Sequence, residues 1–275
     1  MKIQNYQEKY KLKEVSIDRL HLGVNNYSVA TKLQNMFSFQ KGNNYYQHKY
    51  SSNGFTVYIN PRITNIPKVK LIINTKYFKG ILSDNVKRIL ELTQGWYIQA
   101  MDLAYDFNTK ISNSFVLTRS NAKKNKKYDP NTYYFSKNSD SRSLLYDKKK
   151  QLKEKRNLTI PDKYLTRYEI RMRLSKGRKR LIDRDFSYIR KFIDKHNFIS
   201  EYSKLPLSTE EKKIIRDSKD RKNENLIGTN HTVSKIRSTV KEHSVPFYSI
   251  FELQWQEMLG HIIDAIDNQE KKLSA

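Results

Sequence analysis

The chain has 275 residues and a formal net charge of +25, because 53 Lys and Arg residues outnumber 28 Asp and Glu residues. It contains no cysteine, which excludes disulfides, thiolate zinc sites and cysteine nucleophiles. The charge excess is larger than the magnitude of about 2 to 8 that a small domain needs for solubility, and it attracts polyanions. We therefore expect a nucleic acid as the partner.

Hydrophobic residues make up 37% of the chain and aromatic residues 12%, which is enough for a buried core. No apolar run reaches the length of a signal peptide or the roughly 20 residues of a membrane span. We therefore expect a cytoplasmic protein with no membrane partner.

The first part of the chain predicts a series of strands, because short runs of β-branched and aromatic residues alternate with Asn, Gly, Pro and Ser clusters. The predicted strands are Val15–Gly23, Tyr45–Tyr50, Phe55–Asn60, Val69–Asn74, Ile98–Phe107, Asn131–Phe135, Ser141–Lys148 and Leu165–Leu174. Two helices interrupt the series, at Ser28–Phe39 and at Ser83–Gly95, where Ser83 is a suitable N-cap.

After Gly177 the spacing of apolar residues changes to that of helices. The predicted helices are Arg184–Leu205, Leu207–Asp220, Val233–His243 and Val245–Leu273. This order predicts an α+β fold, with a mostly antiparallel central sheet, flanking helices and a helical C-terminal region. We expect two domains, 1–175 and 176–275.

Three of the predicted strands carry charged or phenolic side chains on one face, since residues two apart in a strand point the same way. Asp102 and Asp106 share a face in one strand, and Tyr146 and Lys148 share a face in another. In the third strand the polar face carries four charged residues, which are Arg167, Glu169, Arg171 and Arg173. These faces are either exposed to solvent or part of a site, because burying an unpaired charge is costly.

The chemistry of these side chains suits phosphoryl transfer. Carboxylates without His or Cys favour Mg²⁺ or Mn²⁺, and the six histidines are scattered without a metal-ligand spacing. Arginine and lysine neutralise developing charge, while a tyrosine can attack phosphorus to form a covalent ester. No glycine-rich phosphate loop is present.

The order of these segments resembles that of the Rep_trans-type rolling-circle replication initiators of small bacterial plasmids and related mobile elements. The resemblance covers Val15 to Leu174 and includes the strand Met101–Phe107. Its most specific part is Tyr146-Asp147-Lys148 followed by the Arg-x-Glu of Arg167 and Glu169.

The resemblance implies that residues 1–175 form a metal-dependent nicking domain that uses Mg²⁺ or Mn²⁺. By this resemblance Tyr146 is the nucleophile, and Lys148 and Arg167 lie against the scissile phosphate. The acidic metal ligands are Asp102 and Glu169, with Asp106 as a third.

Two positions depart from the family pattern. Leu144 stands where an arginine is often found, and Phe135 stands where a glycine is expected. Tyr133 or Tyr134 therefore remains an alternative nucleophile.

Three basic clusters, Lys123–Lys127, Lys148–Arg156 and Lys176–Arg180, flank the polar strands and are expected to hold DNA phosphates. A solvated charge run is the alternative for any one cluster. The predicted DNA-binding residues are Lys123, Lys124, Lys126, Lys127, Arg142, Lys149, Lys150, Arg171, Arg173, Arg178, Lys179 and Arg180.

The expected activity is origin binding, nicking of one strand and later rejoining. A conjugative relaxase with the same chemistry and a non-enzymatic DNA-binding initiator or regulator are the alternatives. The expected partner is double-stranded and single-stranded origin DNA. The resemblance also suggests a host helicase and a homodimer, with residues 176–275 providing DNA binding or dimer contacts.

Overall fold

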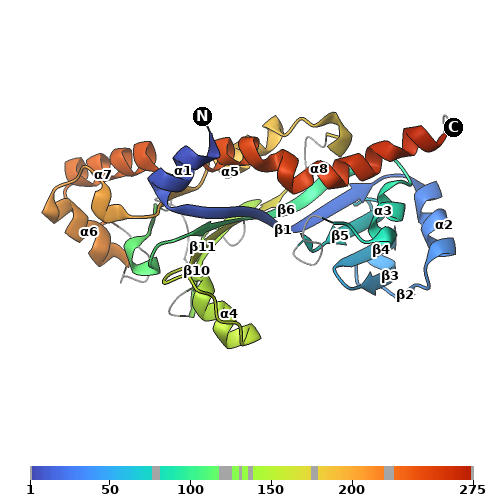
Figure 1. Cartoon of the computed structure of the whole chain (residues 1–275), viewed down its shortest axis with the longest axis horizontal. Helices are drawn as coiled ribbons and strands as arrows, with labels where there is room; N and C mark the ends of the chain where they lie inside the picture. The colour runs from blue at the N-terminus through green and yellow to red at the C-terminus, as the bar shows by residue number, and fades with distance from the viewer. Residues whose placement is uncertain are drawn as a thin grey trace. The chain divides into compact units, whose positions relative to one another are not determined.

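The computed structural model describes residues 2–75, 81–117, 126–129, 132–135, 139–174, 179–219 and 226–273 (Figure 1). For 118–138 and 269–273 it describes at most the backbone. The chain divides into two compact units. The first unit comprises 1–16, 104–171 and 190–253, and the second comprises 17–103, 172–189 and 254–275. Each unit combines segments from both sides of residue 175.

Four elements contribute residues to both units. They are β1 (Leu12–Val24), β6 (Tyr97–Phe107), β11 (Thr166–Arg173) and α8 (Phe247–Leu273). The other elements belong to one unit each.

The second unit is built on the strand order β2-β3-β4-β5-β1-β6. The pairings from β2 to β1 are antiparallel. Its own elements are α2 (Tyr27–Met36), β2 (Gln40–Lys41), β3 (Tyr46–Ser52), β4 (Phe55–Pro61), β5 (Val69–Ile73) and α3 (Asp84–Leu90). Ser83 caps α3 as predicted, since its hydroxyl accepts a hydrogen bond from the Val86 backbone amide.

Alternation of side chains along β1 and β5 separates a buried face from a polar one. Leu20, Leu22 and Val24 are almost fully buried, and their antiparallel partners on β5 are the buried Ile73, Leu71 and Val69. This pattern places the apolar core of the second unit on one side of these strands.

The first unit contains the strand order β6-β11-β10-β9-β8 and a separate β12-β7 pair. Its own strands are β7 (Phe115–Leu117), β8 (Lys126–Asp129), β9 (Thr132–Phe135), β10 (Ser141–Asp147) and β12 (Asn197–Ile199). Its own helices are α1 (Ile3–Tyr10), α4 (Lys148–Arg156), α5 (Arg190–Ile193), α6 (Thr209–Lys219) and α7 (Asn230–His243).

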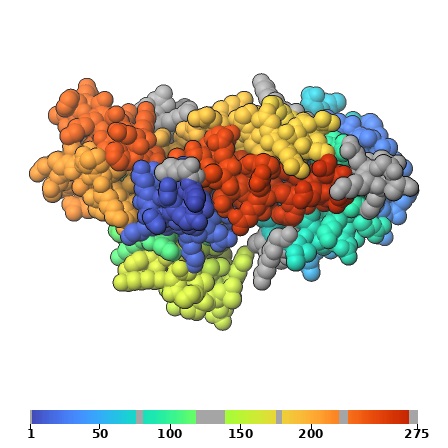
Figure 2. All heavy atoms as spheres, turned by 45° about the horizontal axis from the view of Figure 1, so that its top comes forward, coloured from blue at the N-terminus to red at the C-terminus, as the bar shows by residue number. Residues whose placement is uncertain are grey.

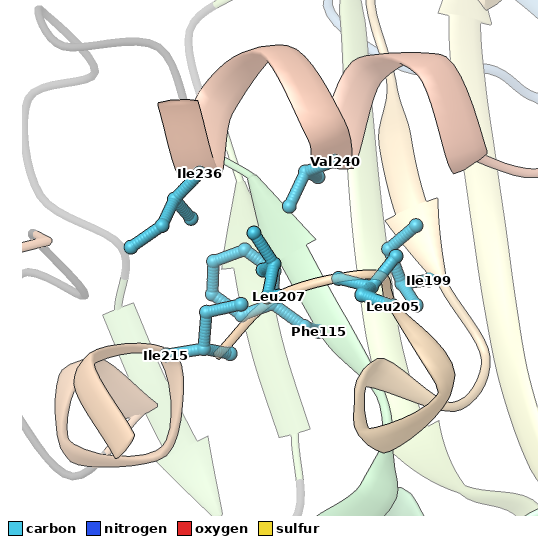
Figure 3. Packing of buried hydrophobic residues seen from close by; sticks show 7 residues of the cluster. All are labelled: Phe115, Ile199, Leu205, Leu207, Ile215, Ile236 and Val240. Atoms are coloured by element: carbon cyan, nitrogen blue, oxygen red, sulfur yellow. The ribbon is translucent and has the colours of Figure 1, made fainter. Parts of the chain in front are cut away.

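One hydrophobic cluster of the first unit joins the β12-β7 pair to α6 and α7 (Figure 3). Phe115 of β7 and Ile199 of β12 are directly opposite each other in the antiparallel pair. Ile215 of α6 and the α7 residues Ile236 and Val240 pack into the same cluster and are completely buried.

A second cluster of the first unit is aromatic. Tyr168 of β11 stacks on Phe198 of β12 with ring centroids 4.8 Å apart and on Phe247 of α8 at 5.2 Å. Tyr105 and Phe107 of β6 pack against Phe247 and Phe198. The apolar face of β11 predicted from the sequence is therefore buried in an aromatic core.

The predicted α+β class and the mostly antiparallel sheet are confirmed, and the predicted strands of the first 175 residues are found with small shifts of their ends. The predicted helix Arg184–Leu205 is wrong. This segment contains the short helix α5 and the strand β12, followed by a 3-10 turn at Tyr202–Lys204. Strand pairing with β7 and burial of Phe198 override the local helical spacing.

The predicted strand end at Lys148 is also corrected, because Lys148 is the first residue of α4. Asp147 ends β10 and caps α4, where its carboxylate accepts a hydrogen bond from the Lys150 backbone amide at 2.9 Å. Among the helices described, none is long and apolar enough to cross a membrane.

Candidate active site

The candidate site lies in the first unit, where β10 and β11 are neighbours in the sheet. The Lys148 backbone amide donates a hydrogen bond to the Leu165 carbonyl at 2.8 Å, which ties the end of β10 to the start of β11. This link places Tyr146, at the end of β10, beside the polar face of β11.

Tyr146 and Glu169 form the centre of the site. The Tyr146 hydroxyl donates a hydrogen bond to Oε1 of Glu169, and both residues are only 4% exposed. The other carboxylate oxygen, Oε2, accepts hydrogen bonds from Nη2 of Arg171 at 2.7 Å and from Nε at 3.2 Å. A buried carboxylate therefore has a phenol on one oxygen and a guanidinium on the other.

A second charged pair connects β11 with β6. Arg167 donates from Nε and Nη2 to the two carboxylate oxygens of Asp106, with both distances 2.6 Å. The residues are 7% and 4% exposed. Such a two-bond pair fixes both side chains and satisfies charges that would be costly to bury alone.

Lys148 is near Tyr146 but is engaged within its own helix. Its Nζ lies 5.8 Å from the centroid of the Tyr146 ring and donates to Oε1 of Gln151 at 3.2 Å. Its positive charge contributes to the potential around the tyrosine.

The carboxylate oxygens of two predicted metal ligands, Asp106 and Glu169, accept hydrogen bonds from protein side chains. Both oxygens of Asp106 bind Arg167, and both oxygens of Glu169 accept hydrogen bonds from Tyr146 or Arg171. Asp102 belongs to the second unit. In the part of the chain that the structure describes, no group of three or more His, Asp or Glu side chains could hold a metal. A cation at Asp106 or Glu169 would therefore have to replace one of these hydrogen-bond partners.

The alternative tyrosines are located by the register of β9 on β10. Thr132 is directly opposite Tyr146, whereas Tyr133 is opposite Leu145 and Tyr134 is opposite Leu144. Neither alternative occupies the ladder position opposite Tyr146.

The predicted DNA-binding residues of the first unit have different surroundings. Arg142 is half-buried on β10. On α4, Nζ of Lys149 donates to the Asp162 carbonyl at 2.6 Å, and Lys150 pairs with Glu154 at 3.6 Å. Arg171 contacts Glu169, a link that its position two residues along the same strand face could have suggested.

Of the other predicted DNA-binding residues, some lie in the second unit, two lie in β8 of the first unit, and the rest lie outside the described residues. Lys179 pairs with Asp185, and Arg180 pairs with Asp183 at 2.8 Å, while Arg173 is exposed. Lys126 and Lys127 belong to β8, of which the backbone is described, and Lys123, Lys124 and Arg178 lie outside the described residues.

Comparison with known proteins finds matches among solved structures. No protein-family model matches the sequence, and no curated protein matches it. Among solved structures, the chain is similar to a rolling circle replication initiator protein from Geobacillus stearothermophilus, with 13% sequence identity and a TM-score of 0.45. The match covers 82% of this chain and 96% of that one.

Proposed function

We propose that this chain is a rolling-circle replication initiator that nicks one DNA strand with Tyr146 as the nucleophile, stays covalently linked and later rejoins the strand. The observation that carries the proposal is the hydrogen bond from the Tyr146 hydroxyl to the buried Glu169, beside Arg171. A nucleophile next to a base that is itself held by a third group is the arrangement that activates a hydroxyl. The resemblance of the Tyr-Asp-Lys and Arg-x-Glu segments to those of the initiators supports the same conclusion.

In the proposed reaction Glu169 acts as the general base. The Tyr146 oxygen attacks phosphorus and its proton passes to the Glu169 carboxylate, while the P–O ester bond of the strand breaks. The leaving oxygen takes up a proton from water, and Glu169 returns its proton to water. Rejoining is the reverse, in which the strand hydroxyl attacks the phosphotyrosine. The atoms balance without a further reactant.

Arg171 is better placed than Arg167 to act beside the phosphate. The Arg171 side chain is 28% exposed and contacts Glu169, whereas Arg167 is buried and binds both oxygens of Asp106. We therefore assign Arg171 to hold Glu169 and to add positive charge near the developing negative charge. Arg167 becomes a positioning residue for the sheet.

The dependence on Mg²⁺ or Mn²⁺ stays a prediction, and no step above is assigned to a metal. Origin DNA, a host helicase and a homodimer likewise remain predicted partners. The division into a nicking domain, 1–175, and a C-terminal region for DNA or dimer contacts, 176–275, is proposed on the same resemblance.

The test is a nicking assay on a supercoiled plasmid that carries the DNA flanking the gene for this chain, with Mg²⁺, Mn²⁺ or EDTA. Wild-type protein is expected to convert the plasmid to open circles and to leave a protein–DNA adduct that withstands denaturant. Tyr146→Phe is expected to slow nicking by at least about a thousandfold, because the attacking oxygen is lost. Its affinity for DNA is expected to remain.

The matched control is Tyr164→Phe, which removes the hydroxyl of a tyrosine that is 40% exposed in the same unit. It is expected to nick like wild type. If Tyr146→Phe nicks at the wild-type rate, the nucleophile is another residue. If wild type binds the plasmid but does not nick it under any metal condition, the non-enzymatic initiator is favoured. A relaxase is distinguished by cleavage of a transfer origin instead of a replication origin.

A further inference from the structure

A group of basic residues lies on the polar face of the second unit, outside the candidate active site. Arg19, His21 and Gly23 alternate on β1 with Leu20, Leu22 and Val24, whose side chains are buried in the core. The first three residues therefore share the opposite face of the strand.

Lys70 of β5 joins this face through the strand register. It is directly opposite Gly23 in the antiparallel pair β1–β5, and directly opposite residues point to the same side of a sheet. The place of a side chain on Gly23 is taken by its neighbours, since a Cβ there would lie 2.9 Å from Cγ of Pro67 and 3.1 Å from Cγ of Gln99.

Arg173, at the end of β11, completes a group that we call the basic cluster: Arg19, His21, Lys70 and Arg173. Burial, followed by the charges of Lys70, Arg19 and Arg173, lowers the pKa of His21 from 6.5 to about 3. Burial and then the charge of Arg173 lower the pKa of Lys70. The geometry agrees with these shifts, because the Leu174 backbone amide donates to the Gln99 carbonyl at 2.7 Å and so holds the end of β11 beside Gln99, whose Cγ lies near Gly23 of β1.

Among the residues that the structure describes, no acidic side chain pairs with this cluster to offset the repulsion. Within the described ranges, no member of the basic cluster has a hydrogen bond or ion pair with another residue. By contrast, Lys179, Arg180 and Lys87 of the same unit each pair with an aspartate. Lys70 and His21 are partly buried, whereas Arg19 and Arg173 are exposed. A positive charge on Lys70 or His21 without a counter-charge is therefore costly unless an anion binds beside it.

A buried amide lies next to the cluster. Oε1 of Gln99 on β6 is buried and has no hydrogen-bond partner among the described residues. Cγ of Gln99 lies 3.1 Å from the position that a Cβ on Gly23 would occupy. Since the oxygen and nitrogen of an amide are exchanged by a simple flip, this side chain can present its NH₂ group to an anion.

We propose that the basic cluster, with Gln99, is a binding site for a phosphate group, and that a phosphodiester of the DNA backbone is its ligand. Arginine guanidinium groups match phosphate oxygens with paired hydrogen bonds, and Lys70 adds a point charge. A bound phosphate would also allow His21 to take a proton and donate a further hydrogen bond. The choice of DNA as the source of the phosphate rests on the proposed function, whereas the site itself does not.

The experiment follows the His21 ring by NMR in the full-length protein labelled at histidine, titrated between about pH 5 and 7. The probes are a short oligothymidylate, inorganic phosphate, and NaCl at equal ionic strength. In NaCl, His21 is expected to stay neutral throughout this range. Bound oligothymidylate is expected to raise its pKa by at least about two units, because the phosphate charge opposes the neighbouring cations.

Lys70→Gln is the test variant, and Lys87→Gln is its control. Lys87 carries the same charge in the same unit but is 45% exposed and paired with Asp84. Lys70→Gln is expected to remove most of the rise in the His21 pKa that oligothymidylate causes, because it removes one of the charges that bind the phosphate. Lys87→Gln is expected to leave that rise unchanged.

Several results would overturn the proposal. The first is a His21 pKa that neither oligothymidylate nor inorganic phosphate changes. The second is an equal rise of the His21 pKa in NaCl. The third is a rise with oligothymidylate in Lys70→Gln that is as large as in wild type. A response to oligothymidylate that exceeds the response to inorganic phosphate supports DNA as the source. Equal responses retain the phosphate site and overturn the assignment to DNA. The NMR titration needs no DNA cleavage. A negative result in it therefore contradicts the phosphate site, whereas a negative result in the nicking assay contradicts the proposed function.

Discussion

Glu169 and Asp106 are two carboxylates on adjacent strands, and their different partners give them different roles. Each contacts an arginine of β11, but Glu169 also accepts the Tyr146 hydroxyl, whereas Asp106 uses both oxygens for Arg167. The first arrangement leaves a carboxylate able to accept a proton from a phenol. The second neutralises two buried charges and fixes β6 against β11.

Asp106→Asn is expected to destabilise the protein by about 3–5 kcal/mol, because it leaves the buried Arg167 without its counter-charge. Urea unfolding followed by circular dichroism measures the change. The control is Asp194→Asn, which breaks the exposed pair Arg190–Asp194 of the same unit. It is expected to cost less than about 1 kcal/mol. Equal effects of the two substitutions would contradict a structural role for the Arg167–Asp106 pair.

At the scale of elements, α4 is unusual because it has no buried residue and carries six basic side chains among its nine. Figure 1 shows it projecting beyond the end of β10 in the first unit, and in Figure 2 the yellow-green atoms of this part of the chain lie at the lower edge of the view. Local interactions support it. Asp147 caps its first turn, and Asn157 ends it in a left-handed conformation. The basic residues of its last turn interact favourably with the negative end of the helix dipole. A basic helix that begins directly after the proposed nucleophile suits contact with DNA phosphates.

The triple substitution Lys153→Gln, Lys155→Gln and Arg156→Gln on α4 is expected to weaken DNA binding. The slope of log K against log[salt] is expected to fall in magnitude by up to about 3, since about one counterion is released for each phosphate contact. Fluorescence anisotropy with a labelled duplex at several salt concentrations measures it.

A matched triple on α6, Lys212→Gln, Lys213→Gln and Arg216→Gln, removes the same charge from a helix that also carries Glu210, Glu211 and Asp217. It is expected to change the slope by less than 1. If both triples reduce the slope equally, total charge and not α4 governs binding.

The segment Arg184–Leu205 shows where element prediction failed. Its apolar spacing fits a helix, but β12 forms inside it because β7, about 80 residues earlier, offers an antiparallel partner. Phe198 then fills a place between Phe107 and Tyr168. The local spacing of apolar residues does not depend on a pairing partner so far away along the chain, so the strand could not be predicted from that spacing.

At the scale of the whole molecule, a net charge of +25 acts on folding and on binding in opposite senses. Like charges repel in the compact state and lower its stability, whereas the same charges attract DNA. Salt screens both interactions.

The melting temperature of the free protein is therefore expected to rise when NaCl increases from about 20 to 300 mM, while affinity for DNA falls over the same range. A stabilisation of about 1 kcal/mol corresponds to a rise of about 2–4 °C for a chain of this size. Thermal unfolding followed by circular dichroism, without DNA, measures the change. A melting temperature that stays constant or falls would contradict net self-repulsion.

The sequence by itself determined the α+β class, most strands of the first 175 residues and the alternation that separates Arg167, Glu169 and Arg171 from Tyr168 and Ile170. These features are local, because the periodicity of a strand and the residues of a turn can be recognised within a short stretch of sequence. Only the tertiary structure decided which charges meet. It paired Asp106 with Arg167, placed Tyr146 on Glu169 and left the basic cluster without an acidic partner among the described residues. Pairings across strands depend on register and strand order, which the local pattern of residues does not specify.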